Sequence, residues 1–258
     1  MSHEPVLLNE VLVGLKLQIG ETVLDATINR GGHALAMGRM IGATGHLIGL
    51  DADSTALAEA KANLAPLECK KNFLLGNFRN LTSLLNPIGV TQINVVLFDL
   101  GLSSEQLAES ERGFSFQLDG SLKMTFGRET NDDLTAEEVV NSWDEENLVT
   151  IIKSYGEERF AKPIARAMVT VRKLKPIHTS FDLVNAIREW VPIWYQKRRL
   201  HFATKTFQAI RLTVNDEFRA LREGLEGAWQ ALAPKGRLAV ISFHSLEARQ
   251  VKIFFKEK

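Results

Sequence analysis

The chain has 258 residues, of which 45% are hydrophobic and 24% charged, enough for one large domain or for a domain that carries an insertion. Lysine plus arginine (31) balances aspartate plus glutamate (31), so any nucleic-acid partner must be bound by a local basic patch. A single cysteine, Cys69, excludes an internal disulfide and a cysteine-based zinc cluster. The sequence shows no signal peptide and no apolar run of membrane-spanning length, so we expect a soluble, cytoplasmic protein.

The N-terminal part of the chain alternates short apolar runs with helical patterns. The runs predict strands at Thr22–Ala26, His46–Leu50, Asn72–Leu75 and Ile93–Leu100. Helices are expected between them at His33–Ile41 and at Ser54–Leu64, the latter with Ser54 as its N-cap. Strands that alternate with helices predict an α/β fold with a parallel, doubly wound sheet, whose ligands bind at the carboxyl ends of the strands.

The alternation stops in the middle of the chain, where only helical spacing of apolar residues is found. These helices are predicted at Thr135–Asn141, Glu145–Tyr155, Arg159–Lys173 and Ser180–Trp190. The pattern then predicts a long helix at Thr206–Leu232, a turn at Pro234–Gly236, a strand at Arg237–Phe243 and a helix at Ser245–Lys256. We therefore predict a sheet domain formed by residues 1–106 and 204–258, with a helical insertion at 107–203 for substrate recognition.

The turn after the first predicted strand has the layout of a nucleoside-binding site. The strand ends in Asp25, and a pair of glycines, Gly31 and Gly32, lets the backbone approach a ligand because no Cβ intervenes. Asp51, at the end of the second strand, can accept hydrogen bonds from both ribose hydroxyls.

Two cofactors remain open for this turn. NAD prefers a G-x-G-x-x-G pattern, and Asn29 occupies the place of the first glycine. Asparagine tolerates positive φ, so the turn is still feasible while the fingerprint is lost. S-adenosylmethionine has no pyrophosphate and needs acids near its sulfonium and amino groups, which Asp25 and Asp99 at strand ends supply. The residues favour the methyl donor without deciding the question.

Four other groups of residues have a functional and a structural interpretation each. Asp99 is followed by Gly101, Ser103 and Gln106, which can contact a cofactor or form an ordinary loop. In Arg112–Phe116, two aromatic rings flank a serine, which is typical of a lid or a base-stacking platform, or of a loop that fills its own core. His244 can position a substrate or be a satisfied structural histidine.

The fourth group is basic, and taken alone it is more typical of a solvated surface, whereas beside a nucleotide-modifying site it becomes a candidate for contacts to RNA phosphates. It consists of Lys197, Arg198, Arg199, His201, Lys205 and Arg211. No Walker lysine, serine nucleophile elbow or H-E-x-x-H pair is found, and no metal is predicted.

Seven stretches, spread over nearly the whole chain, resemble the bacterial RsmH (MraW) family of 16S ribosomal RNA cytosine-N4 methyltransferases. They are Pro5–Leu8, Arg30–His33, Leu97–Gly101, Glu111–Phe116, Tyr155–Lys162, Thr206–Ala209 and Ile241–Glu247. The resemblance implies a class I methyltransferase, Rossmann-like fold with an inserted helical domain, and methylation of the N4 amine of a cytosine in the small ribosomal subunit.

The resemblance also implies site residues. The predicted S-adenosylmethionine contacts are Gly31, Gly32, His33, Asp51, Phe78, Asp99 and Gln106. Asp99, Ser103 and His244 are the catalytic candidates. The candidates for contacts to RNA are Arg112, Phe114, Phe116, Lys197, Arg198, Arg199, Lys205 and Arg211, and Phe243 is a further ring on which the base can stack.

The chain departs from the family pattern at several positions. Asn29 replaces a glycine, Lys123 an acid, Phe202 a proline and Ala248 an acid, and the chain ends before the segment expected to supply the last strands. These departures leave open a non-catalytic RNA-binding or ribosome-assembly factor on the same scaffold. An NAD-dependent oxidoreductase is another alternative. A DNA amino-methyltransferase is disfavoured, because Asp99 is not followed by a Pro-Pro-aromatic motif.

Overall fold

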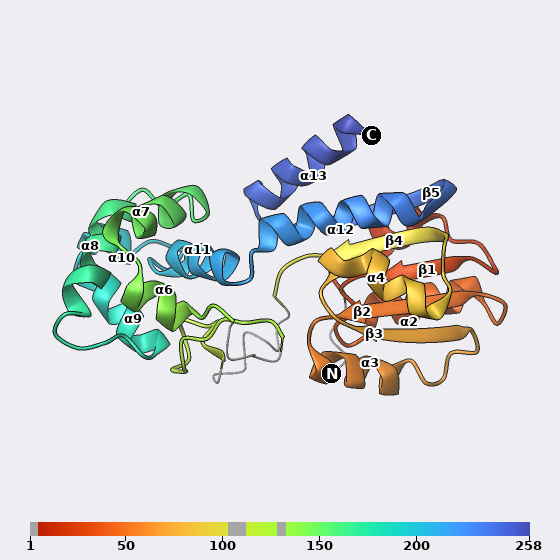
Figure 1. Cartoon of the computed structure of the whole chain (residues 1–258), viewed down its shortest axis with the longest axis horizontal. Coiled ribbons are helices and arrows are strands. Elements are labelled where there is room, and N and C mark those ends of the chain that lie inside the picture. Colours follow the sequence, from red (N-terminus) through yellow and green to blue (C-terminus); the bar gives the residue numbers. More distant parts are fainter. Residues whose placement is uncertain (1–4, 103–111, 128–132) are drawn as a thin grey trace. The chain divides into compact units, whose positions relative to one another are not determined.

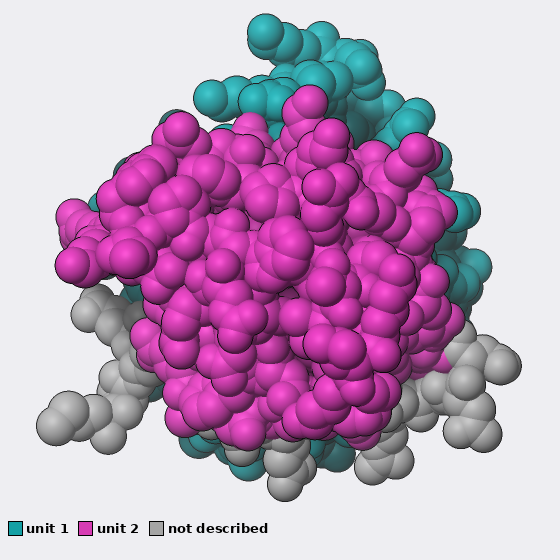
Figure 2. Space-filling view, turned by 90° about the vertical axis from the view of Figure 1, so that its left-hand side faces the viewer, with its two compact units in different colours: residues 1–101, 218–258 teal, residues 102–217 magenta. Residues whose placement is uncertain are grey.

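The computed structural model describes residues 5–102, 112–127 and 133–258. The chain divides into two compact units, residues 1–101 with 218–258 (unit 1) and residues 102–217 (unit 2), which Figure 2 shows in different colours. Within the described ranges, no helix is long and apolar enough to cross a membrane.

Unit 1 is built on a five-stranded parallel sheet, in which the strand order is β3-β2-β1-β4-β5 (Figure 1). The strands are β1 (Thr22–Asp25), β2 (His46–Asp51), β3 (Lys70–Leu75), β4 (Ile93–Asp99) and β5 (Leu232–Ile241). From β1 the order runs outward through β2 and β3, and it then resumes on the other side of β1 with β4. The predicted doubly wound sheet is confirmed, and its switch point lies between β1 and β4.

Helices cover both faces of this sheet, because alternate residues of each strand point to opposite sides. Val23, Leu47 and Val95 join a cluster with α1 (Leu8–Leu15), α2 (Gly32–Ile41) and α3 (Ser54–Asn63). Their neighbours Leu24, Ile48 and Val96 join a second cluster with α4 (Leu81–Leu85), α12 (Glu217–Ala231) and α13 (Ser245–Glu257). Nearly continuous apolar strands are what burial on both faces requires.

Three details of the predicted elements are wrong. The turn expected at Pro234–Gly236 lies within strand β5, which begins at Leu232. Asp53, not Ser54, caps α3, because its Oδ1 accepts hydrogen bonds from the backbone N–H groups of Thr55 (2.8 Å) and Ala56 (3.5 Å). The long helix expected at 206–232 is two helices, α11 (Thr204–Val214) and α12, separated at Asp216, where φ is +46°. The division into units falls at this break, so α11 belongs to unit 2.

Unit 2 is helical in its described part, apart from one isolated β-bridge between Ser121 and Thr179. Its helices are α6 (Ala136–Ser142), α7 (Glu145–Ser154), α8 (Ala161–Val171), α9 (Ser180–Arg188), α10 (Ile193–Gln196) and α11. They share one core, to which every one of these helices contributes. The helix starts are capped by side chains, with Thr135 on α6, Asp144 on α7 and a capping box of Thr179 and Asp182 on α9.

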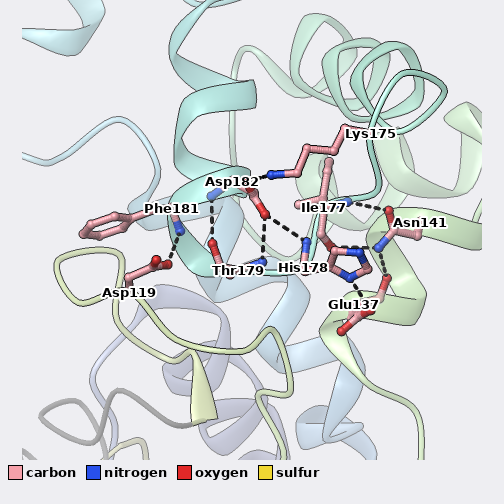
Figure 3. A network of polar contacts seen from close by, with 9 residues as sticks. All are labelled: Asp119, Glu137, Asn141, Lys175, Ile177, His178, Thr179, Phe181 and Asp182. Carbon is pink, nitrogen blue, oxygen red and sulfur yellow. Dashed lines mark hydrogen bonds and ion pairs between the residues drawn. The ribbon is translucent and has the colours of Figure 1, made fainter.

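A polar network fixes the segment that leads into α9 (Figure 3). Asn141 donates through Nδ2 to the carbonyl of Ile177 (2.8 Å) and accepts its N–H at Oδ1 (2.9 Å). The His178 ring lies 2.8 Å from the Glu137 carboxylate, and Asp182 accepts hydrogen bonds from Lys175 and from two backbone N–H groups. These groups are engaged with one another, so we assign the network a structural role.

Candidate active site

Three acids end three adjacent strands at the carboxyl edge of the unit 1 sheet. Asp25 is paired with Gly49 on one side and with Leu97 on the other. Strands β2 and β4 therefore continue past Asp25, to Asp51 and Asp99 respectively. This register explains why Asp25 is only 2% exposed, and it concentrates negative charge at the switch point of the sheet.

The turn between β1 and α2 depends on unusual backbone conformations. Asn29 has φ +47° and Gly31 has φ +85°, so the expectation that Asn29 tolerates the left-handed region is confirmed. A Cβ on Gly31 would lie 3.1 Å from the Leu64 side chain, and one on Gly32 would lie 2.6 Å from Cγ of Pro5. Gly31 is thus favoured by its backbone geometry and by close packing, and Gly32 by close packing alone.

Asp51 is oriented by two backbone groups. Its Oδ2 accepts the N–H of Asn29 (2.8 Å), and its Oδ1 accepts the N–H of Asp53 (2.9 Å). A carboxylate has about four acceptor positions, so each oxygen can still accept a hydrogen bond from a ligand hydroxyl. Burial raises the pKa of Asp51, and the two backbone hydrogen bonds oppose that shift. The contact with Asn29 links the glycine turn to Asp51, the acid predicted to bind the ribose, and the sequence did not predict this contact.

The buried Asp25 and His33 form a cluster with the half-buried Asp99 beside this turn. Nε2 of His33 lies 3.6 Å from Oδ2 of Asp99, and His33 is 5% exposed. Thr27 joins the two acids, since its N–H donates to Oδ1 of Asp25 (3.3 Å) and its hydroxyl accepts the N–H of Asp99 (2.6 Å). Burial raises the pKa of Asp25 to about 7, although the nearby His33 acts in the opposite direction.

Several polar atoms of this cluster have no hydrogen-bond partner in the described structure. They are both ring nitrogens of His33 and Oδ1 of Asp99. Buried polar atoms without partners are rare in folded proteins, and they point to a ligand that completes the site. A cationic sulfonium ligand with an amino group and a ribose matches this set of carboxylates, so the residues present fit S-adenosylmethionine.

The whole chain, residues 1–258, matches the model of the MraW methylase family. The chain belongs to this family. It is 44% identical over 253 residues to a ribosomal RNA small subunit methyltransferase H from Symbiobacterium thermophilum, which covers 98% of this chain and 79% of that protein. It is 43% identical over 258 residues to the protein of the same name from Limosilactobacillus fermentum, covering 99% of this chain and 81% of that one.

Among solved structures, the chain resembles an S-adenosylmethionine-dependent O-methyltransferase from Thermotoga maritima at 12% identity and a TM-score of 0.33, over 38% of this chain and 37% of that one. Family membership decides between the two cofactors, since these methylases use S-adenosylmethionine. The oxidoreductase and the non-catalytic assembly factor are accordingly not favoured.

Other cofactor residues predicted from the family resemblance stay predictions. Phe78 begins a short 3-10 helix after β3, and its ring packs edge-on against Phe98, with 5.5 Å between centroids. A Cβ on Gly224 of α12 would lie 2.6 Å from this ring, so Phe78 is held tightly in the core of unit 1. Ser103 and Gln106 lie outside the described residues.

The two aromatic rings predicted to form a stacking platform, Phe114 and Phe116, have different surroundings in unit 2. Phe114 is 4% exposed and stacks on Phe126, with 5.6 Å between centroids, as in the alternative of a loop that fills its own core. Phe116 is half-buried, and its ring lies parallel to that of His201 at 4.5 Å. Nη1 of Arg112 donates to the carbonyl of Phe126 (3.2 Å). The structure thus gives Phe114 a packing role.

The predicted basic group is likewise not uniform. Lys197, Arg198 and Arg199 are exposed. Lys205, by contrast, donates to the carbonyl of Glu157 (2.7 Å). Arg211 makes two hydrogen bonds with the Glu217 carboxylate, at 2.7 and 3.1 Å, and both side chains are largely buried. The exposed three suit phosphate contacts better than Lys205 and Arg211 do.

The catalytic candidate His244 caps α13 in the structure. Its Nδ1 accepts the N–H of Glu247 (3.4 Å), and Glu247 in turn accepts the N–H groups of Phe243 (3.0 Å) and His244 (3.4 Å). This capping box is the structural alternative for His244. The adjacent Phe243 is 56% exposed and contacts Gly101, where a Cβ would lie 3.2 Å from its ring. An exposed aromatic ring therefore lies beside the end of β4.

Proposed function

We propose that this protein methylates the N4 amine of a cytosine in small-subunit ribosomal RNA, with S-adenosylmethionine as methyl donor. The observation that carries the proposal is the group of acids at the switch point, where Asp99 lies 3.6 Å from the His33 ring and, in the described structure, its Oδ1 has no hydrogen-bond partner. The methylase family supports transfer of a methyl group, and the names of the relatives support ribosomal RNA of the small subunit as the substrate.

The surroundings of each acid indicate which part of the cofactor it suits. Asp51 is oriented by two backbone N–H groups and suits the ribose hydroxyls. Asp25 and Asp99 are joined through Thr27 and suit the cationic sulfonium and amino groups of the cofactor. When bound, S-adenosylmethionine supplies a methyl group on a sulfonium centre, and the protein positions the substrate and accepts its proton.

The protein must position a weak nucleophile. The lone pair of the cytosine N4 amine is delocalised into the ring, so alignment with the methyl group supplies much of the rate. Asp99 accepts one N4 hydrogen at Oδ1, which favours a pyramidal nitrogen and gives the amine proton an acceptor after transfer. Cys69 takes no part, because it is 3% exposed, it precedes β3 at the opposite edge of the sheet, and burial raises the pKa of its thiol.

The target base must leave its stack to reach the site. Phe243 offers an exposed ring beside the backbone of Gly101, at the end of the strand that carries Asp99. Stacking of the extruded cytosine on Phe243 would hold the base plane near the Asp99 carboxylate. We assign Phe243 this positioning role.

The test is transfer of labelled methyl to small-subunit ribosomal RNA, with mass spectrometry of nucleosides to identify the modified base. Asp99→Ala and Asp51→Ala are compared with Glu59→Gln, which alters an acid that is exposed on α3 and paired with Arg30 at 2.6 Å. We expect N4-methylcytidine from the parent and the control, and little from the other two. Normal methylation by both Asp99→Ala and Asp51→Ala would overturn the site, and a different methylated base would overturn the substrate.

A further inference from the structure

A patch of exposed apolar side chains surrounds the short helix α10 in unit 2. Trp190 is 37% exposed, Ile193 71%, Trp194 54% and Leu200 51%. Large apolar side chains seldom gather on a protein surface unless they bind something. The patch belongs to none of the site residues derived above, and it needs its own explanation.

The backbone that presents this patch is firmly held. Tyr195 is 4% exposed, and its hydroxyl donates to Oε2 of the buried Glu158 at 2.5 Å. Burial and this carboxylate raise the pKa of Tyr195, so the hydroxyl stays a donor at neutral pH. Gln196 donates to the carbonyls of Arg188 (2.9 Å) and Val191 (3.0 Å). Trp194, which directly precedes these two residues, is therefore displayed on a preorganised support.

A guanidinium group accompanies the exposed indole. Cζ of Arg159 lies 5.1 Å from the ring centroid of Trp194 and 5.1 Å from that of Phe160. Phe160 also contacts the rings of Trp194 and Tyr195, at 5.9 and 4.7 Å. Arginine beside an exposed aromatic ring is a combination on which unpaired nucleobases stack.

The charge near this patch is mainly positive, although the exposed Glu189 directly precedes Trp190. Lys197, Arg198 and Arg199 follow α10 and are exposed, and the sequence has no acid between Trp190 and Asn215. Glu158, the acid in contact with Tyr195, is 2% exposed. Such a surface complements a phosphate backbone.

We propose that Trp194 and Arg159 form a stacking platform for an unpaired base of a single-stranded RNA segment, whose phosphates contact Lys197, Arg198 and Arg199. The inference rests on the proposed function and adds to it a binding surface for the RNA strand. A single strand is specified because the bases of an RNA duplex stack on each other and leave no face for an indole.

The platform is tested by fluorescence anisotropy with a labelled single-stranded RNA oligonucleotide, using the full chain. Trp194→Ala should weaken binding about 5- to 100-fold, the range for loss of one stacked base. Trp194→Phe should restore most of the affinity, because it keeps an aromatic face. Trp229→Ala is the matched control. Trp229 is also partly exposed (39%) and also has a cation nearby, Lys258 at 6.0 Å, but it lies on α12, outside the proposed platform.

Two further measurements show whether a loss of RNA affinity comes from lost stacking, from unfolding or from lost charge. Calorimetric titration with S-adenosylmethionine should give the parent affinity for Trp194→Ala, because the cofactor residues belong to unit 1. Arg198→Ala should reduce the slope of log affinity against log salt by about 0.7, the value for one phosphate contact to a single strand.

The outcomes distinguish this inference from the proposed function. If the parent methylates ribosomal RNA and Trp194→Ala binds the oligonucleotide as tightly as the parent, the platform is overturned and the function stands. An effect of Trp194→Ala on assembled subunits but not on protein-free RNA would also overturn it, in favour of docking on a ribosomal protein. A parent that neither binds nor methylates RNA overturns both.

Discussion

The acidic edge of the sheet in unit 1 and the aromatic surface around α10 in unit 2 differ in charge, in burial and in the kind of ligand that they suit. At the sheet edge, Asp25 is buried and Asp51 and Asp99 are half-buried, and backbone N–H groups of the glycine turn and of the β2–α3 connection orient Asp51. Around α10, cations and aromatic rings are exposed above one buried tyrosine. A small cationic cofactor needs a precise, desolvated site, whereas a long polyanion needs accessible charge and flat apolar faces. The difference suggests that cofactor binding and RNA binding can be altered independently.

The largest expected effect is on catalysis. Asp99→Asn keeps the size of the side chain but removes its charge, and we expect the rate of methyl transfer to fall by about 10²- to 10⁴-fold. Single-turnover assays with ribosomal RNA measure this, and RNA affinity should stay at the parent value. An equal loss of RNA affinity would contradict the separation of the two surfaces.

The parallel sheet and most of its connections could be predicted because they depend on local patterns. Apolar runs ending in Asp25, Asp51 and Asp99 suffice to predict three strands and a ligand edge. The break between α11 and α12 could not be predicted, because the helical pattern is continuous there. It is associated with Asn215, which accepts the N–H of Phe126 (2.9 Å) and donates to the carbonyl of Met124 (2.7 Å), residues far away in the sequence.

The candidate site shows the same limit. Asn29 and the glycine pair were recognisable, since positive φ restricts residue choice. The unpaired ring of His33, the bridge through Thr27 and the support of Trp194 by Tyr195 depend on contacts between distant segments. Charge and aromaticity along the sequence do not show which side chains are buried. For this reason the sequence could not show that Phe114 has a packing role and that His244 has a capping role.

The next effect concerns the support of the aromatic surface. Tyr195→Phe removes the donor to Glu158 and leaves a buried carboxylate oxygen without that partner, at a cost of about 1–3 kcal/mol in the free energy of unfolding. Urea denaturation measures the loss. Phe181→Leu, a change of a 42% exposed ring elsewhere in unit 2, is the control and should cost less. Equal stability of Tyr195→Phe and the parent would show that Glu158 contributes nothing through this contact.

A third effect is a pH dependence of stability, which tests whether the buried Asp25 ionises at the sheet edge. Burial raises the pKa of Asp25 from 3.8 to about 7. Between these values the folded protein binds a proton that the unfolded chain does not, so this residue lowers stability as pH rises from about 4 to 7, with no further change above 7. His33, Asp51 and Asp99 are the ionisable side chains that act on it.

Asp25→Asn should abolish that part of the pH dependence. The variant should gain stability relative to the parent, and the gain should be larger at pH 8 than at pH 5. Thermal unfolding of the cofactor-free protein at both pH values measures it. A gain that is the same at pH 5 and pH 8 would contradict ionisation of Asp25 as the cause.

The smallest expected effect comes from an ion pair outside both surfaces. Glu59 and Arg30 are 2.6 Å apart, but their side chains are 43% and 47% exposed. Solvent screens such a pair, so Glu59→Gln should change the free energy of unfolding by less than about 1 kcal/mol. Arg30 directly precedes the glycine turn, so the variant also tests whether the turn needs this pair. Since Gly31 and Gly32 are fixed by Leu64 and Pro5, we expect calorimetry to give the parent affinity for S-adenosylmethionine. A clear loss of affinity would extend the cofactor site from the buried acids to the exposed end of the turn.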